Sequence, residues 1–204
     1  MSSRSEQEEF WAGEFGIGYI DRNSSEEWVR SNKVFFARSL SGLSQSPGSI
    51  LEIGSNIGLN MLALKDLYPH AELASVEINT DACTALASIV DQVFNQSIQE
   101  YEAKEKFELV LIKGVLIHMN PDDLLSTYKK IAASSSKYVL IAEYYNPTPI
   151  AIDYRGHKDK LFKRDFAGEF LDANPTWRIQ NYGFVYHKDQ FPQDDLTWFL
   201  LTAG

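Results

Sequence analysis

A short apolar segment followed by two glycines constrains the fold of this chain more than any other feature. Residues 49–60 read Ser-Ile-Leu-Glu-Ile-Gly-Ser-Asn-Ile-Gly-Leu-Asn, and the apolar residues at the start predict a short buried strand. Gly54 and Gly58 allow a sharp turn and a close approach of backbone to a ligand. Leucine and alanine at helical spacing then predict a helix that Pro69 ends. A strand, a glycine turn and a helix N-terminus are together typical of phosphate- and nucleoside-binding corners.

The spacing within this segment excludes the common dinucleotide fingerprint. That fingerprint, Gly-x-Gly-x-x-Gly, requires a glycine where this chain has Asn56. An acidic residue instead precedes the first glycine, in the pattern Glu52-x-Gly54-x-x-x-Gly58. This pattern resembles motif I of the class I methyltransferases that use S-adenosylmethionine (SAM). The resemblance implies that the turn and the carboxylate face the amino-acid end of SAM. An ordinary strand–glycine–helix turn stays the alternative on this segment alone.

A second predicted strand ends in a carboxylate and favours the same interpretation. Residues 71–79 contain this strand, with Glu77 at its end and a helix expected over 80–89. A carboxylate only accepts hydrogen bonds, and a ribose offers two hydroxyl donors, so Glu77 suits the ribose of an adenosine. Ile78 would then lie against the adenine.

Composition limits the partners of the chain. Its 204 residues predict one domain with a substantial core. The formal net charge of -9 argues against a nucleic-acid partner, because phosphate binding needs a basic face. The single cysteine, Cys83, excludes an internal disulfide and a cysteine-based zinc site. A signal peptide and an apolar run of membrane-spanning length are both lacking, which predicts a cytoplasmic protein with no membrane partner.

The whole chain, 1–204, is predicted to form one methyltransferase domain. Residues 1–48 form an N-terminal helical lid or strap, and residues 49–204 form the SAM-binding core with a substrate-loop insertion at 144–174. Within the first part, Phe10–Asn23 is rich in glycine and large apolar residues. This composition favours a lid over a ligand cleft about as much as an ordinary strap on the core.

The order of the elements predicts the fold class. Strand–helix alternation followed by a terminal strand pair indicates an α/β, Rossmann-like class I methyltransferase fold with a seven-stranded, mostly parallel sheet and an antiparallel terminal strand. A capping box at Ser24–Glu27 begins a helix that runs to about Leu40, and Asn120 caps another. Further strands are expected at 92–94, 107–113, 137–143, 177–186 and 196–202, and further helices at 6–12 and 160–172.

Ligands of such sheets bind outside the carboxyl ends of the strands. This rule brings the segments after five predicted strands, together with the proposed lid, into one crevice. The residues expected to hold the cofactor are Trp11, Tyr19, Glu52, Gly54, Ser55, Asn56, Gly58, Glu77, Ile78, Ser97, Ile98, Lys113, Gly114 and Val115.

The segment 143–157, at and after the end of the predicted strand 137–143, mixes carboxylate, phenol, guanidinium and imidazole groups. This mixture suits an amine-bearing or polyhydroxylated small molecule. The Asn/Asp-Pro-Pro-aromatic run of amino-methylating DNA enzymes is missing after the fourth strand, and no metal site is expected. Expected substrate contacts are Tyr19, Tyr144, Tyr145, Asn146, Arg155 and His157. The candidates for removing the amine proton are His118, Glu143 and His157. Imidazole has the ordinary pKa best placed for this task, and such a base would make turnover rise with pH through the imidazole range.

Longer stretches carry a more specific resemblance. They are residues 10–16 with 19–23, 143–149, 154–157, 160–169 and 191–195. Together they resemble the pseudaminic acid biosynthesis-associated methylase family over nearly the whole chain. The resemblance implies methylation of an amino-sugar nitrogen or a similar group.

These features predict a SAM-dependent N-methyltransferase for a small-molecule amine, which releases S-adenosylhomocysteine (SAH) and works as a monomer or homodimer. Two alternatives stay open. One is O-methylation of a hydroxylated metabolite, and the other is a SAM-binding subunit without chemistry.

Overall fold

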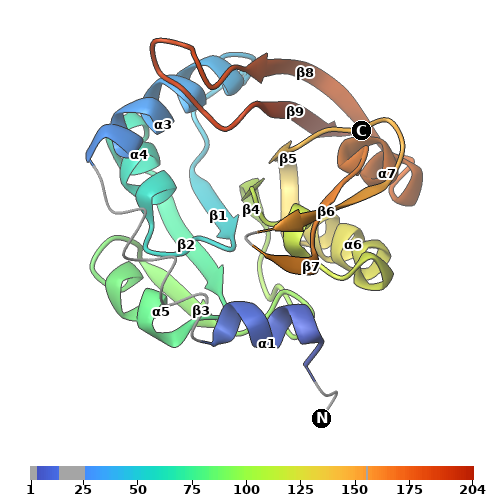
Figure 1. Cartoon of the computed structure of the whole chain (residues 1–204). Coiled ribbons are helices and arrows are strands. Elements are labelled where there is room, and N and C mark those ends of the chain that lie inside the picture. Colours follow the sequence, from blue (N-terminus) through green and yellow to red (C-terminus); the bar gives the residue numbers. More distant parts are fainter. Residues whose placement is uncertain (1–3, 14–25, 155) are drawn as a thin grey trace.

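A seven-stranded sheet forms the centre of the molecule in the computed structural model, which describes residues 4–13, 26–154 and 156–204 (Figure 1). Five of its strands are parallel neighbours, and β9 runs antiparallel between β5 and β8. In sheet order the strands are β3 (Gln92–Asn95), β2 (Glu72–Glu77), β1 (Ser49–Ile53), β4 (Phe107–Lys113), β5 (Ser135–Glu143), β9 (Leu196–Ala203) and β8 (Trp177–Val185). The predicted fold class is confirmed.

Helices cover both faces of this sheet (Figure 1). One face packs against α3 (Glu26–Ser39), α4 (Leu59–Leu67) and α5 (Thr80–Leu86), and the other against α6 (Leu124–Ser134) and α7 (Phe166–Ala173). The central strands are therefore apolar on both sides. In β4, Leu109 and Leu111 face the first layer while Val110 and Ile112 face the second, and all four are fully buried. This burial explains the near-continuous apolar run of that strand.

A two-stranded hairpin is the main departure from the sequence prediction. β6 (Ile150–Tyr154) pairs with β7 (His157–Lys163) where the sequence predicted a loop and a helix over 160–172. The helix, α7, begins only after Asp165, whose side chain accepts a hydrogen bond from the Gly168 backbone N–H. Charged residues dominate β7, and its turn lacks the Asn-Gly or Asp-Gly pair that signals a hairpin. The sequence therefore carries no clear signal for these two strands.

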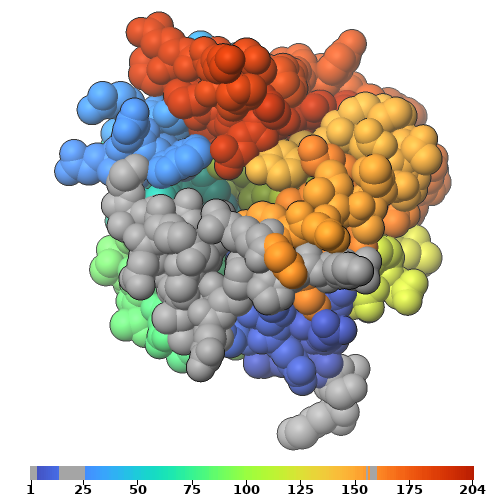
Figure 2. All heavy atoms as spheres, in the orientation of Figure 1, coloured from blue at the N-terminus to red at the C-terminus, as the bar shows by residue number. Residues whose placement is uncertain are grey.

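The first helix, α1 (Glu6–Ala12), begins with a capping box in which Ser5 and Glu8 exchange hydrogen bonds. It lies beside the β6–β7 hairpin, and Figure 2 shows the dark blue helix next to the orange hairpin at the surface. Short 3-10 helices, η1 (Leu116–His118) and η2 (Pro121–Asp123), connect β4 to α6. Within the described part of the chain, none of the helices has both the length and the apolar character needed to span a membrane.

Candidate active site

A cavity of about 540 Å³ opens at the carboxyl ends of β1, β2 and β4. Its walls come from the turns after these strands, from α1 and α3, from the β6–β7 hairpin and from the loop before β9. The volume lies in the usual range for small-molecule and cofactor sites. The doubly wound topology thus places a cavity at the edge of the sheet where the sequence predicted one.

The glycine turn after β1 forms part of this wall. Gly54 adopts a φ of 75°, and a Cβ there would lie 2.5 Å from a methyl carbon of Val115, so only glycine fits. Gly58, also at positive φ, serves packing instead. A Cβ on Gly58 would meet Leu86 and Ile89 at 2.9 Å, and the residue does not line the cavity. The sequence had placed both glycines at the cofactor.

Glu77 ends β2 with its carboxylate on the cavity wall. The side chain is only 7% exposed and accepts hydrogen bonds from the backbone N–H groups of Asn56 and Asn79, each at 2.8 Å. Burial raises the pKa of this carboxyl group, while hydrogen bonds from the backbone N–H groups of Asn79, Asn56 and Ile78 act to lower it. Each carboxylate oxygen keeps a second lone pair, so Glu77 can still accept hydrogen bonds from ligand hydroxyls.

Most other residues expected at the cofactor also line the cavity. They are Trp11, Ser55, Asn56, Ile78, Ser97, Ile98, Lys113, Gly114 and Val115. Gly114 has a φ of 67°, and nothing lies within 4 Å of the position of a Cβ, so its backbone borders open space.

Glu52, the acidic residue of the glycine motif, lies behind the wall rather than on it. It is fully buried, and Oε1 accepts a 2.6 Å hydrogen bond from Nδ2 of Asn60, which does line the cavity. Among the described residues, Oε2 has no hydrogen-bond partner. Burial raises the pKa of Glu52 to about 7. The motif led us to expect a direct contact between Glu52 and the ligand. In the structure it is Asn60, held by Glu52, that lines the cavity.

Glu143 also lies outside the cavity wall, although the sequence made it a candidate base. Its Oε1 accepts hydrogen bonds from the backbone N–H groups of Val115 and Leu116, both at 2.9 Å. Burial raises the pKa of Glu143 to about 7. This carboxylate fixes the turn after β4, and the turn in turn presents Gly114 to the cavity.

His118 also lies on the cavity wall, in contact with two aromatic rings. Its ring centroid lies 4.6 Å from that of Trp11 and 5.0 Å from that of Tyr154, and all three residues line the cavity. Nδ1 lies 2.7 Å from the carbonyl oxygen of Lys160. Burial lowers the pKa of His118 to about 4, so the ring is neutral at neutral pH. The sequence predicted that His118 would titrate in the ordinary imidazole range, and its buried position moves the titration well below that range.

The remaining predicted substrate residues are divided. Tyr144 lines the cavity, but Tyr145 is 43% exposed on another face, where its ring lies 6.4 Å from that of Phe199. Asn146 is half-buried and does not line the cavity, and its backbone N–H donates to the carbonyl oxygen of Arg164. Tyr19, Arg155 and the side chain of His157 lie outside what the structure describes.

Sequence reasoning expected Lys113 at the cofactor but missed the polar side chains that surround it on the wall near β4. Nζ of Lys113 donates a long, 3.4 Å hydrogen bond to Oδ1 of Asn32, which also accepts from Nε2 of Gln193 at 3.1 Å. Asp194 lines the cavity beside them. These residues come from α3, β4 and the loop before β9, far apart in the sequence. The run Phe191–Asp195 was the one signal available, and it indicated a family rather than a contact.

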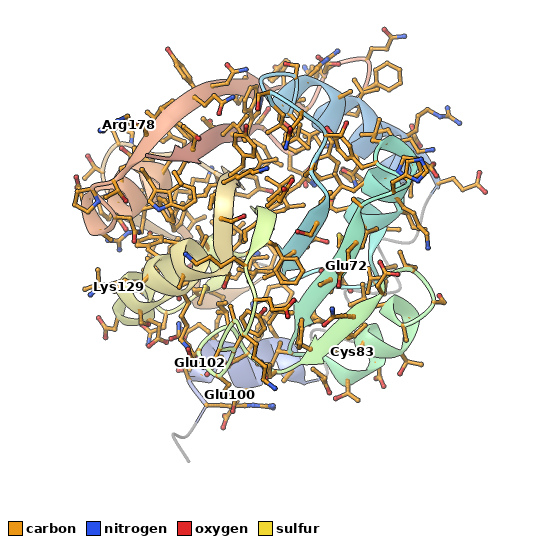
Figure 3. The ribbon with its side chains drawn as sticks, turned by 180° about the vertical axis from the view of Figure 1, so that it is seen from behind. Glu72, Cys83, Glu100, Glu102, Lys129 and Arg178 are labelled. Atoms are coloured by element: carbon orange, nitrogen blue, oxygen red, sulfur yellow. The ribbon has the colours of Figure 1, made fainter. Side chains whose placement is uncertain are left out.

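Cys83 is remote from this chemistry. Figure 3 shows it on α5, on the helical layer outside the sheet. Its Sγ donates to the carbonyl oxygen of Glu77 at 3.4 Å, and burial raises its pKa to about 11. A thiol that stays protonated and does not line the cavity is no nucleophile for this site.

Comparison with known proteins finds no family model and no curated sequence that matches the chain. Solved structures do match over nearly its full length. The Burkholderia thailandensis 1,6-didemethyltoxoflavin-N1-methyltransferase, solved with its substrate and SAH, has a TM-score of 0.72 at 13% identity and covers 100% of this chain and 92% of its own. The Synechocystis PCC 6803 magnesium protoporphyrin IX methyltransferase with SAH has a TM-score of 0.71 at 12% identity, covering 97% and 98%.

A third similar structure is the plantazolicin methyltransferase BpumL in complex with SAH, with a TM-score of 0.68 at 11% identity and coverage of 97% and 94%. None of these comparisons ties the chain to the pseudaminic acid biosynthesis-associated family. At such low identities the likeness concerns the fold, and it agrees with the strand order found here. The chain has the class I methyltransferase fold.

Proposed function

We propose that this chain is a SAM-dependent methyltransferase that N-methylates a small-molecule amine and releases SAH. The observation that carries this proposal is the pairing of the Gly54 turn with the buried Glu77 carboxylate on the wall of one cavity. The three similar structures, all holding SAH, support the choice of cofactor.

The residues on the wall fit this cofactor. Glu77 offers acceptor lone pairs for the two ribose hydroxyls, and Ile78 and Ile98 offer apolar surface for the adenine. The open space beside Gly114 admits a ligand close to the backbone after β4. When bound, SAM supplies an activated methyl group for in-line displacement by the acceptor nitrogen.

The protein's own contribution is largely positioning. Holding the acceptor nitrogen in a near-attack geometry is worth up to ~7–11 kcal/mol in favourable cases. Trp11, Tyr144 and Tyr154 surround the acceptor side of the cavity with aromatic surface. Such rings attract a cation, and positive charge develops on the nitrogen as it gains the methyl group.

His118 orients the acceptor rather than acting as a strong base. Because Nδ1 faces a carbonyl oxygen, the proton resides on Nδ1, and Nε2 is left to accept a hydrogen bond from the amine N–H. A ring whose pKa is lowered to about 4 is too weak a base to deprotonate an alcohol. A neutral amine needs no prior deprotonation, so this environment favours N- over O-methylation. The resemblance of the longer sequence motifs supports an amino-sugar nitrogen as the acceptor.

Calorimetry and product analysis test the proposal. SAH should bind while NAD does not, and Glu77→Ala should weaken SAH binding by about 1–3 kcal/mol, since hydrogen bonds to a charged group are lost. The matched control is Glu72→Ala, at the exposed far end of the same strand (Figure 3). A panel of amines incubated with SAM should give one product heavier by a methylene unit. Binding of SAH with no product from amines or alcohols would favour a non-catalytic subunit, and tight NAD binding without SAH binding would refute the assignment.

A further inference from the structure

The side chain of Lys113 is a weakly paired cation on the cavity wall. It ends β4, and its Nζ makes one long hydrogen bond, 3.4 Å to Oδ1 of Asn32, and lies 5.7 Å from the ring centroid of Phe35. Among the side chains that the structure describes, no carboxylate forms an ion pair with it. An ammonium group has three N–H donors, so this environment leaves donor capacity unused.

Asn32 and Gln193 fix the orientation of this ammonium. Both side chains are buried, at 3% and 1% exposure. Oδ1 of Asn32 accepts from both Nζ of Lys113 and Nε2 of Gln193, which uses the two lone pairs of that oxygen. Oδ1 of Asn32 therefore cannot accept a second N–H group of Lys113. Lys113 and Gln193 both line the cavity, so the unused N–H groups of Lys113 are available to a molecule inside it.

Electrostatics around Lys113 point to a ligand of single negative charge. Burial lowers the pKa of the ammonium, and the carboxylates of Glu52, Asp194 and Glu143 oppose that effect. Lys113 is the one lysine or arginine among the described residues of the wall, which also carries Glu8 and Asp123. A dianionic phosphate would face these carboxylates with only one cation to hold it. A carboxylate on a molecule that is elsewhere neutral or positive meets the charge pattern.

We propose that Lys113, oriented by Asn32 and Gln193, binds a carboxylate group inside the cavity. This inference rests on the proposed function, because the carboxylate has two possible sources there. One is the amino-acid end of the cofactor, and the other is a carboxylate on the methyl acceptor. Either source makes Lys113 a determinant of which molecules the site accepts.

The first experiment tests the cofactor as the source. Calorimetry compares the binding of SAH, its decarboxylated analogue and 5′-methylthioadenosine to the wild type, to Lys113→Met and to Lys129→Met. Lys129 is exposed on α6 on the back of the molecule, so its substitution is a matched control (Figure 3). A cofactor source predicts that wild type and Lys129→Met prefer SAH over the decarboxylated analogue at least tenfold. Lys113→Met should lose that preference and bind 5′-methylthioadenosine as the wild type does.

The second experiment tests the acceptor as the source. Initial rates are measured with pairs of amines that differ in one carboxylate, such as an α-amino acid and its carboxamide. An acceptor source predicts that the wild type has a lower KM for the carboxylate member and that Lys113→Met removes this difference, with SAH affinity unchanged. Lys113→Arg, which keeps the charge, should retain a preference in whichever experiment shows one.

If the wild type shows no preference for the carboxylate in either experiment, the inference is wrong. This test needs no variant, so it applies even if Lys113→Met fails to fold. A preference that survives in a folded Lys113→Met also overturns it. Both outcomes leave the proposed function intact as long as SAH binds and amines are methylated. A protein that binds no SAH and methylates nothing removes the proposed function, and this inference with it.

Discussion

Nδ1 of His118 lies 2.7 Å from the carbonyl oxygen of Lys160, which is 42 positions later in the chain. A carbonyl oxygen only accepts hydrogen bonds, so it fixes the neutral tautomer with the proton on Nδ1. The side chain of the same lysine forms a 2.6 Å ion pair with Glu6 of α1. One residue of the hairpin therefore contacts both the candidate catalytic ring and the helix that covers the cavity.

His118→Ala and His118→Gln should lower kcat about 10²-fold with little change in SAH affinity, because loss of the ring misplaces the acceptor nitrogen and not the cofactor. Product formation at saturating acceptor, followed by mass spectrometry, measures this. His70→Ala, at an exposed position outside the cavity, is the control. Because the ring is neutral at neutral pH, His118 should contribute no inflection to the profile of kcat against pH between about pH 6 and 8. The profiles of the wild type and of His118→Gln should therefore have the same shape in this range. Full kcat in His118→Ala would contradict this role and would mean that the aromatic residues alone orient the acceptor.

Glu143→Gln should change how stability depends on pH. Burial raises the folded-state pKa of Glu143 to about 7 from an ordinary value of 4.5, so between these values the folded state binds more protons than the unfolded chain. Wild-type stability therefore falls as pH rises through this window, by about 3 kcal/mol from this one group. The amide keeps an oxygen for the two backbone donors and removes the charge, so urea unfolding of Glu143→Gln should show a smaller loss of stability. An unchanged slope relative to wild type and to the exposed control Glu105→Gln would contradict this.

Two glycines offer a matched test of where the ligand lies. Gly114 and Gly156 both have positive φ, 67° and 84°, and at both a Cβ would meet nothing within 4 Å. Alanine should therefore cost a similar ~1–2 kcal/mol of folding stability at each. Only Gly114 borders the cavity, so Gly114→Ala should weaken SAH binding at least tenfold while Gly156→Ala leaves it unchanged. Equal SAH affinity in the two variants would place the ligand away from the turn after β4.

We expect the segment Phe10–Asn23, of which residues 14–23 lie outside what the structure describes, to close over the bound cofactor. In its described part, the carbonyl oxygen of Trp11 accepts a 3.4 Å hydrogen bond from Nδ2 of Asn79, and both residues line the cavity. Lids of this kind exclude water during transfer. Trypsin cleavage after Arg22 should slow when SAH is added, while cleavage after the exposed Arg4 serves as an internal control. Identical rates at Arg22 with and without SAH would argue for a simple strap.

The sequence alone was enough to predict the sheet, its doubly wound order and one edge of the cavity. Gly54 and Glu77 were predictable because each stands at the end of an apolar strand, and parallel strands bring their carboxyl ends to one edge. Such signals are local and depend on the periodicity of apolar residues and on backbone conformations that glycine permits. They hold whatever the distant parts of the chain do.

Only the tertiary structure decided which side chains at that edge reach the cavity. Glu52 and Glu143 stand in or at the end of strands, as the sequence indicated, yet both carboxylates turn away into buried hydrogen bonds. Successive strand residues point to opposite sides, so a position at a strand end does not fix a direction. Lys113 meets Asn32 and Gln193 across separations that carry no sequence periodicity, and the packing of α3 and of the loop before β9 creates that contact. The glycine turns of the wall were thus predictable from local sequence, whereas the placement of its charged side chains depends on tertiary packing.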